Sequence, residues 1–232
     1  MKAVILAGGL GTRLKPFTEV IPKPLLPIGE KAILEVQIDL LKSHGFDEIF
    51  LATNYKSEYI EKFFGDGTRY GVRLKISKED QPLGTAGPLK LIKELLNEPF
   101  VVMNGDILCR ADFSKLFDFA VTKDALLTIT VKKFVTPYAF GNIHFKGDYV
   151  KDIEEKPDIV TYALAGIYVM RPEVLDLIPG NSYYGMDSLI KSMLSLKYPV
   201  AKYELVEYWL DIGRVEDYEK AQDYYKKNFL EQ

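Results

Sequence analysis

The chain has 232 residues, of which 47% are hydrophobic and 27% charged, and its formal net charge is −3. This length and composition fit a globular domain with a large core, and the slight negative charge argues against nucleic acid as a general partner. No apolar run reaches bilayer length, and Lys2 leads directly into a short apolar run, so neither a membrane span nor a signal peptide is expected. The one cysteine, Cys109, cannot form an internal disulfide and favours a cytoplasmic location.

The first half of the chain is predicted to alternate strands with helices. Short apolar or alternating runs predict strands at 3–6, 48–53, 72–76 and 100–103. Apolar residues at helical spacing predict helices at 33–41, around 59–64 and at 86–96. Such alternation favours a mostly parallel sheet with helices on both faces, and ligands then bind beyond the carboxyl ends of the strands.

The second half is predicted to be richer in antiparallel strands. Strands are expected at 125–133, 142–145, 149–154, 162–170 and 200–205, and helices at 172–178, at 186–197 and from about 215. Short turns between several of these strands favour antiparallel pairing. The chain contains no internal repeat or flexible linker, so both halves are expected to share one mixed sheet in a single domain, 1–232.

A glycine-rich turn follows the first predicted strand and points to a phosphate site. The turn contains Gly8, Gly9 and Gly11, ends in Arg13, and is followed by Lys23 between two prolines. Glycine lets the backbone curl so that an anion can reach bare N–H groups. Arg13 adds a planar fork of donors, and Lys23 adds a point charge. Together these groups predict a polyphosphate site.

Two familiar glycine motifs do not match this turn. A Walker loop has lysine and then serine or threonine after its last glycine, whereas Thr12 and Arg13 stand here. The dinucleotide fingerprint has a third glycine where this chain has Leu14, and an acid at the end of the second strand, which here ends in Thr53-Asn54-Tyr55. Only two histidines are present, His44 and His144, so a histidine triad or a zinc site is not expected.

The stretch LAGGLGTRLKPFTEVIPKPLLPIGEKAILE resembles the signature of the sugar-1-phosphate nucleotidylyltransferases, also called nucleotide-sugar pyrophosphorylases. Later segments resemble the same family: PLGTAGPL (82–89), NGD (104–106), EEKP (154–157), AGIYV (165–169) and WLDIG (209–213). The resemblance covers essentially the whole chain. PLGTAGPL and the KPL triplet are most similar to the catalytic domain of GDP-mannose pyrophosphorylases. The implied fold is a Rossmann-like three-layer α/β/α domain with a mixed, mostly parallel central sheet, a nucleotide-binding part (about 1–110) and an antiparallel sugar-phosphate-binding part (about 111–232).

The resemblance also implies roles for charged residues. Arg13 would hold the β- and γ-phosphates of a nucleoside triphosphate, and Lys23 would lie near the α-phosphate and the sugar phosphate. Asp106 and Asp211 each follow an apolar strand, and carboxylates at two strand ends can meet on one magnesium ion. Mg²⁺ is therefore the expected cofactor, with Asp106 and Asp211 as its ligands.

Binding residues for both substrates follow from the same resemblance. Those expected to bind the nucleotide are Leu6, Ala7, Gly8, Gly9, Gly11, Thr12, Gln81, Gly84 and Thr85. Those expected to bind the sugar phosphate are Gly141, Glu155, Lys156 and Gly166. Leu164 departs from the family, because many relatives carry a polar residue, often asparagine, directly before the Ala165-Gly166 pair. A hydroxyl contact to the sugar would be missing there, which weakens any transfer of mannose specificity.

The expected reaction is nucleotidyl transfer from a nucleoside triphosphate to a sugar 1-phosphate, giving a nucleotide sugar and pyrophosphate. PLGTAGPL favours guanylyl transfer to a hexose 1-phosphate, with uridylyl or thymidylyl transfer to glucose 1-phosphate or an amino-sugar phosphate as the alternative. A cytidylyltransferase acting on an alcohol phosphate is a rival that Arg13 and Lys23 count against. A non-catalytic nucleotide-sugar-binding regulatory protein is the alternative of another class. Relatives are often dimers or tetramers, and the sequence leaves open whether this chain forms a homo-oligomer.

Overall fold

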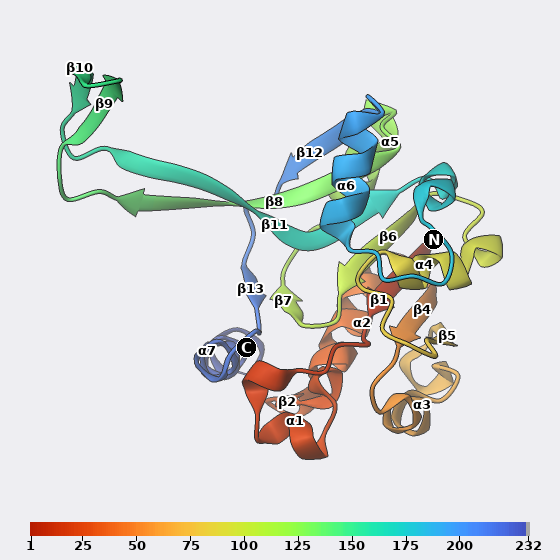
Figure 1. Ribbon diagram of the computed structural model, residues 1–232. Helices are drawn as coiled ribbons and strands as arrows, with labels where there is room; N and C mark the ends of the chain where they lie inside the picture. The colour runs from red at the N-terminus through yellow and green to blue at the C-terminus, as the bar shows by residue number, and fades with distance from the viewer. Residues whose placement is uncertain (231–232) are drawn as a thin grey trace.

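A computed structural model describes residues 1–230, and residues 231 and 232 lie outside the described part. At its centre is a seven-stranded sheet (Figure 1). Its strands are, in spatial order, β12 (Val200–Glu204), β8 (Leu127–Pro137), β11 (Asp158–Met170), β6 (Phe100–Asn104), β1 (Lys2–Leu6), β4 (Glu48–Thr53) and β5 (Arg73–Lys78). Only β11 runs antiparallel to its neighbours in this sheet. The predicted mixed, mostly parallel sheet is confirmed.

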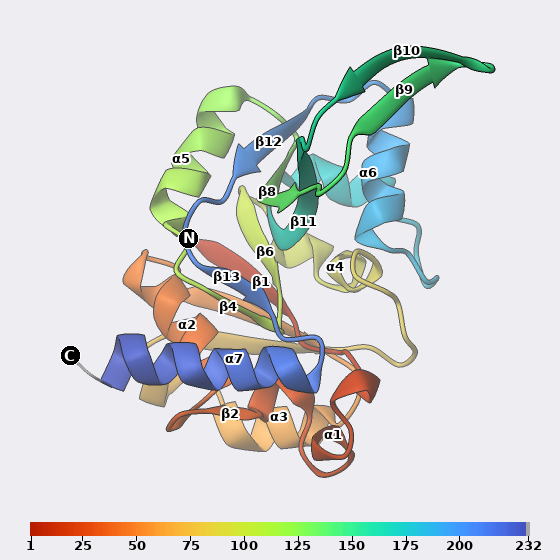
Figure 2. The same ribbon diagram turned by 90° about the vertical axis from the view of Figure 1, so that its left-hand side faces the viewer.

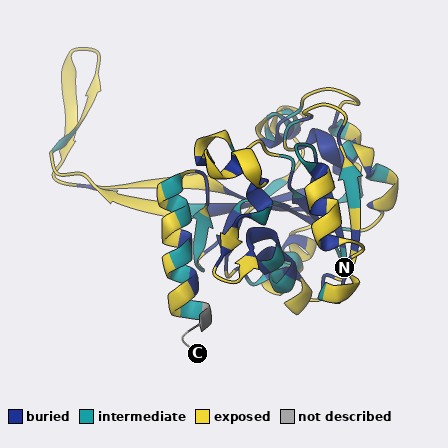
Figure 3. Cartoon of the chain, turned by 90° about the horizontal axis from the view of Figure 1, so that it is seen from below, coloured by how far each residue is buried: buried dark blue, intermediate teal, exposed yellow. Residues whose placement is uncertain are grey.

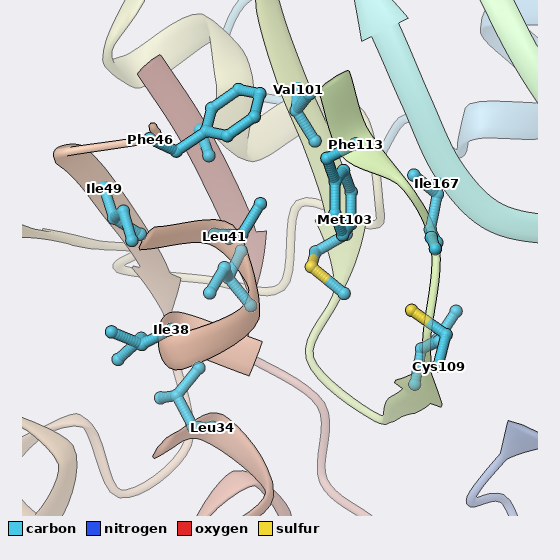
Figure 4. Close-up of a cluster of buried hydrophobic side chains, with 14 of the residues drawn as sticks. Leu34, Ile38, Leu41, Phe46, Ile49, Val101, Met103, Cys109, Phe113 and Ile167 are labelled. Carbon is cyan, nitrogen blue, oxygen red and sulfur yellow. The ribbon is translucent and has the colours of Figure 1, made fainter. Parts of the chain in front are cut away.

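Helices cover both faces of the sheet. On one face lie α2 (Ile33–Ser43), α3 (Ser57–Phe64) and α5 (Phe113–Lys123), and on the other lie α4 (Gly87–Leu91) and α6 (Met186–Ser195). Strand β1 shows why the sheet requires both layers: Ala3 and Ile5 belong to the first apolar cluster, and Val4 belongs to the second. In Figure 4, the α2 side chains Leu34, Ile38 and Leu41 face the strands. Their helical spacing is what predicted this helix from sequence.

Smaller elements surround the sheet. They are the strand pairs β2 (Pro27–Ile28) with β3 (Lys31–Ala32), β7 (Ile107–Cys109) with β13 (Trp209–Asp211) and β9 (Asn142–Lys146) with β10 (Tyr149–Glu154), and the helices α1 (Phe17–Val20) and α7 (Val215–Tyr225). Figure 2 shows α7 beside β2, and Tyr218 on α7 donates to the carbonyl of Pro27 over 2.5 Å. Across residues 1–230, no helix has both the length and the apolar character that crossing a bilayer requires.

Four predicted elements differ in length or type. The helix expected over 86–96 is shorter, because α4 ends at Leu91 and a separate 3₁₀ turn covers Lys93–Leu95. Residues expected as a helix at 172–178 form a 3₁₀ helix, Pro172–Leu177. Strands β8 and β11 extend well beyond the predicted 125–133 and 162–170. Their outer halves pair with each other along a long ribbon, which the apolar pattern alone does not indicate.

Cys109 lies in β7 and is 4% exposed, and burial raises the pKa of its thiol to about 11. At pH 8 only about one thiol in a thousand would then be ionised, and the thiolate is the reactive form. We expect iodoacetamide to leave Cys109 unmodified in the native protein and to alkylate it fully in denaturant, as measured by mass spectrometry. Rapid labelling of the native protein would contradict this placement.

Candidate active site

The glycine-rich turn is held in one shape by its own contacts. Gly11 adopts a left-handed conformation (φ 61°), which favours glycine, and its carbonyl accepts a hydrogen bond from Thr18 Oγ1 over 2.8 Å. A Cβ atom on Gly11 would come within 2.7 Å of Thr18 Cγ2 and 3.2 Å of Lys23 Cβ. The turn is therefore packed directly against the loop that carries Lys23.

Lys23 and Asp106 form a short ion pair beside this turn. Lys23 starts a 3₁₀ turn after the extended Pro22, and its side chain is only 9% exposed. Its Nζ lies 2.5 Å from Asp106 Oδ2. Asp106 follows β6, the strand that pairs with β1. The loop after β1 and the carboxyl end of β6 are therefore joined by opposite charges.

Asp211 lies next to Asp106 because two short strands pair. In the antiparallel β7–β13 ladder, Asp211 stands opposite Ile107, and the N–H of Ile212 donates to the Asp106 carbonyl over 2.9 Å. Burial raises the pKa of the Asp211 carboxyl, and the negative charge of Asp106 raises it further. The positive charges of Lys23 and Arg13 act in the opposite direction on the same pKa. The four charged groups therefore share one electrostatic environment.

Arg13 reaches the same place from the glycine-rich turn. Its guanidinium lies against Gly213, where an added Cβ atom would sit 3.4 Å from Nη2. Gly213 follows Asp211 by two residues, so the fork of Arg13 is held beside the strand that carries the second carboxylate. The structure brings together the two cations and two aspartates that the sequence analysis singled out.

A cleft of about 300 Å³ opens beside this charged cluster. Its lining residues are Leu6, Gly8, Gly9, Leu10, Ala52, Asn54, Glu79, Pro82, Gly84, Thr85, Pro88, Asn104, Asp106 and Tyr183. A smaller space of about 30 Å³, lined by Ala7, Lys23 and Asp106 among others, adjoins it through residues that the two share. Five of the residues predicted to bind the nucleotide line the cleft: Leu6, Gly8, Gly9, Gly84 and Thr85. Ala7 lines the smaller space, and Gly11 and Thr12 lie in the adjoining turn.

Gln81 lies outside this lining. Its side chain is exposed, and its Nε2 donates to the carbonyl of Asn181 over 3.2 Å. Gly84 has φ 82°, and an added Cβ atom there would meet the backbone of Tyr184 at 2.7 Å. The loop after β5 therefore reaches the cleft through Gly84 and Thr85, while the amide of Gln81 is used in a loop contact.

Glu79 is a cleft residue that the sequence analysis missed. It follows β5 and is 7% exposed, and burial raises the pKa of its carboxyl. Its Oε2 accepts the N–H of Leu83 over 2.9 Å, and its Oε1 lies 3.0 Å from the position of a Cβ atom on Gly8. The available signal was an acid directly after a strand, at the edge of the sheet where ligands bind.

The residues predicted to bind the sugar phosphate fall in two places. Gly166 has φ 68°, and a Cβ atom there would come within 2.7 Å of Asn104 Nδ2, so Gly166 adjoins the cleft. Gly141, Glu155 and Lys156 lie instead at the ends of β9 and β10, on the projecting ribbon (Figure 1). They lie near each other, since a Cβ atom on Gly141 would sit 3.4 Å from Glu155 Oε2 and Lys156 Nζ lies 3.9 Å from Glu155 Oε1. None of the three lines the cleft or the smaller space beside Asp106, and Figure 1 shows β9 and β10 away from β6 and β13.

The aspartates fit a divalent cation. Asp106 Oδ1 is buried without a hydrogen-bond partner, and the Asp211 carboxyl lies nearby with its pKa raised by Asp106. A cation between them would satisfy the orphaned oxygen and relieve the repulsion. Within residues 1–230 there is no cluster of three or more His, Cys, Asp or Glu suited to a metal. Magnesium commonly uses one or two carboxylates and completes its shell with phosphate and water oxygens, which matches this pair.

Comparison with known proteins shows the family to which this chain belongs. The family model described as "Nucleotidyl transferase" matches residues 2–228, and this chain belongs to that family. Its sequence is 37% identical over 226 residues to mannose-1-phosphate guanyltransferase of Yarrowia lipolytica, covering 94% of this chain and 62% of the relative. It is 35% identical over 242 residues to UTP–glucose-1-phosphate uridylyltransferase of Synechocystis, covering 95% of this chain and 62% of the relative. The chain therefore spans less than two thirds of these curated relatives.

A solved structure of similar size shares the fold. HddC from Yersinia pseudotuberculosis, in its complex with GMP-PN, superposes with a TM-score of 0.75 at 28% sequence identity. The match covers 97% of this chain and 99% of that one. The fold is thus shared over nearly all of this chain, and the predicted Rossmann-like class is confirmed.

Proposed function

We propose that this protein transfers a nucleotidyl group from a nucleoside triphosphate to a sugar 1-phosphate, and that the group is guanylyl and the acceptor a hexose 1-phosphate. The observation that carries the proposal is the convergence of Arg13, Lys23, Asp106 and Asp211 beside the glycine-rich turn. Two cations and two carboxylates next to bare amides suit a polyphosphate with a metal ion. The printed names of the Yarrowia and Synechocystis relatives support the reaction class.

The reaction joins two anions and requires no protein nucleophile. An oxygen of the sugar phosphate attacks the α-phosphorus, the bond to the β-phosphate bridging oxygen breaks, and pyrophosphate leaves. Arg13 and the amides of the turn would bind the β- and γ-phosphates, and Lys23 would offset charge near the α-phosphate. Asp106 and Asp211 would hold Mg²⁺, which when bound neutralises phosphate charge. The protein contributes positioning and electrostatic stabilisation.

Sugar-phosphate binding is assigned to Gly141, Glu155, Lys156 and Gly166. A carboxylate accepts hydrogen bonds from sugar hydroxyls, and an ammonium pairs with a phosphate. Leu164 offers neither, so it does not supply the hydroxyl contact that the family resemblance would lead one to expect. The identity of the hexose is therefore a question for assay.

Glu79 supports guanine as the base. Its buried carboxylate is an acceptor only, and guanine presents two adjacent N–H donors on its pairing edge, whereas uracil presents one. The printed names of the Yarrowia relative and of the HddC complex with GMP-PN agree with a guanine nucleotide, and that of the Synechocystis relative supports uracil as the alternative.

The test is a panel of four nucleoside triphosphates against several hexose 1-phosphates in Mg²⁺, read by pyrophosphate release. We expect turnover with GTP and a hexose 1-phosphate, and its loss in EDTA. Preferential turnover with UTP or dTTP would replace guanylyl transfer by the alternative. Nucleotide-sugar binding without turnover of any pair would instead indicate a regulatory protein.

Glu79→Gln tests the assignment of the base. Replacing one acceptor oxygen by an amide donor should lower kcat/KM for GTP relative to UTP by about tenfold or more, because one donor of guanine then faces another donor. Glu94→Gln, an exposed carboxylate elsewhere, is the matched control and should leave the ratio unchanged. An equal loss of kcat/KM with GTP and UTP would show that Glu79 only stabilises the loop, through its hydrogen bond with the Leu83 N–H, and does not bind the base.

We also propose the metal ion, the cellular location and the absence of nucleic acid as a partner. Mg²⁺ is proposed as the metal on the two-carboxylate fit at Asp106 and Asp211. The cytoplasmic location rests on the single cysteine in the sequence, and the exclusion of nucleic acid rests on the net charge of −3. Fluorescence microscopy of a tagged chain in its source cell tests the location.

A further inference from the structure

A long two-stranded arm projects from the sheet, and its surface is left largely to solvent. We define the arm as residues 132–164, which comprise the outer parts of β8 and β11 together with β9 and β10. From residue 133 to 164, every residue is exposed except the partly exposed Gly141 and Asn142 and the buried Pro157. Figure 3 shows the arm as an almost continuous exposed ribbon beyond the buried body.

Neither edge of the arm forms hydrogen bonds with a strand of the central sheet. Strand β12 pairs with β8 only as far as Val131, and β6 pairs with β11 only from Ile167 onward. Beyond these points the two strands bond to each other alone. An isolated two-stranded ribbon is marginally stable in water, and free strand edges are templates for pairing with another chain.

The arm also exposes many apolar side chains. On one face Val135 stands opposite Val160, and Tyr162 and Leu164 follow on the same side of β11. The large apolar residues that are at least 39% exposed on the arm are Phe134, Val135, Tyr138, Phe140, Ile143, Phe145, Tyr149, Val150, Ile153, Ile159, Val160, Tyr162 and Leu164. Six are aromatic, and rings of this kind bury about 150–250 Å² each when fully covered. The set can supply an interface of standard size, about 800 Å² per partner.

Contacts at the base of the arm hold it in its projecting direction. Lys132 Nζ donates to the carbonyls of Leu205, Val206 and Glu207 at 3.1, 3.2 and 2.7 Å. The ring of Phe134 meets Trp209 edge to face, and Trp209 Nε1 donates to the Ala165 carbonyl over 2.8 Å. Folding the arm back over its own site would break these contacts. Its outer end therefore stays away from the Asp106 cluster of the same chain.

The direction of the arm favours a second copy of this chain as the partner that covers it. Strand β8 runs parallel to β6, because both are antiparallel to β11, so the arm leaves the sheet at the edge where Asp106 follows β6. A second copy placed at this edge about a twofold axis would have its own arm and its own Asp106 on the side that faces the first copy. Residues 132–164 contain five lysines and five carboxylates, so two arms do not repel each other by net charge.

We propose that two copies of this chain exchange their arms, and that Glu155 and Lys156 of one copy complete the sugar-phosphate site beside Asp106 of the other. This inference rests on the proposed function. The exchange accounts for two observations. It buries the exposed apolar side chains of the arm, and it brings Glu155 and Lys156 to the aspartates from which they are separated within one chain. Each dimer then has two composite sites.

The first experiment measures assembly by sedimentation velocity. We expect a dimer at about 10 µM. The triple variant Phe140→Ser, Phe145→Ser and Val150→Ser should be a monomer at the same concentration, because it removes apolar side chains that would form the dimer interface. The control, Leu95→Ser with Val121→Ser, removes two exposed apolar residues from the body and should remain dimeric. A monomeric wild type, or a dimer that the triple variant leaves intact, would overturn the exchange.

The second experiment tests contribution between copies. Asp106→Asn and Lys156→Ala are carried on differently tagged chains, and the heterodimer is isolated through both tags. Exchange gives one site with both residues intact, so we expect about half of wild-type turnover per dimer, while each variant homodimer falls about a hundredfold or more. An inactive heterodimer would show that each arm serves its own chain, and an active Lys156→Ala homodimer would show that the arm supplies no site residue.

The two experiments separate this inference from the proposed function. Wild-type protein that turns over no pair of substrates would defeat the proposed reaction. A dimer abolished by the arm substitutions would support arm pairing even in that case. Turnover by a wild type that sediments as a monomer would leave the reaction standing and defeat the exchange.

Discussion

Asp106→Asn should lower turnover about a hundredfold or more while leaving the fold nearly as stable as before. The substitution removes one of the two carboxylates that fit Mg²⁺ and keeps an oxygen that can accept from Lys23. It also relieves the repulsion by which Asp106 raises the pKa of Asp211, and Lys23 still has the Asp211 charge nearby. We therefore expect a stability change within about 1 kcal/mol, measured by denaturant unfolding beside the pyrophosphate assay.

Asp39→Asn is the matched control for this prediction. Asp39 is also paired with a lysine, at 2.7 Å from Lys31 Nζ, but on the surface of α2 away from the cleft. Its substitution should leave turnover unchanged. If Asp106→Asn lost stability and activity in step, Asp106 would be a structural residue, and its role as a metal ligand would have to be abandoned.

Lys23→Met should lower turnover by a comparable factor and should also destabilise the fold. Lys23 is the nearly buried cation between the glycine-rich turn and Asp106, and methionine keeps its length without its charge. Asp106 and Asp211 then face each other without the charge of Lys23, so their repulsion is less compensated. Breaking a fully buried pair from one side costs about 3–5 kcal/mol, and the 28% exposure of the Asp106 side chain should make the loss here smaller. Denaturant unfolding and the same turnover assay measure both effects.

The control and the double variant sharpen this second prediction. Lys31→Met removes the surface partner of Asp39 and should change neither turnover nor stability appreciably. Adding Asp106→Asn to Lys23→Met should restore part of the lost stability, because it removes one of the two facing carboxylates. Additive losses of stability in the double variant would mean that Lys23 and Asp106 act independently, against the pairing described above.

The sequence was most informative where local chemistry is demanding. A buried apolar strand followed by glycines and Arg13 has few uses other than an anion site, and proline on both sides of Lys23 marks a stiff loop. Asp106 could be placed because polar residues directly after parallel strands gather at one edge of the sheet. The periodic spacing in α2 likewise fixed its buried face, since packing against a sheet requires one apolar stripe.

Tertiary structure decided the features that depend on partners distant in sequence. Asp211 meets Asp106 only because β13 pairs with β7, and Glu79 becomes a cleft residue only because β5 brings it beside the glycine-rich turn. The lengths of β8 and β11 and the outward course of the arm follow from strand pairing and from the bracing of Lys132. By itself, the sequence determined which side chains could perform this chemistry and which strands and helices carry them. Which of them share a site was decided by long-range pairing, because the free energy of those contacts exists only once distant segments have closed together.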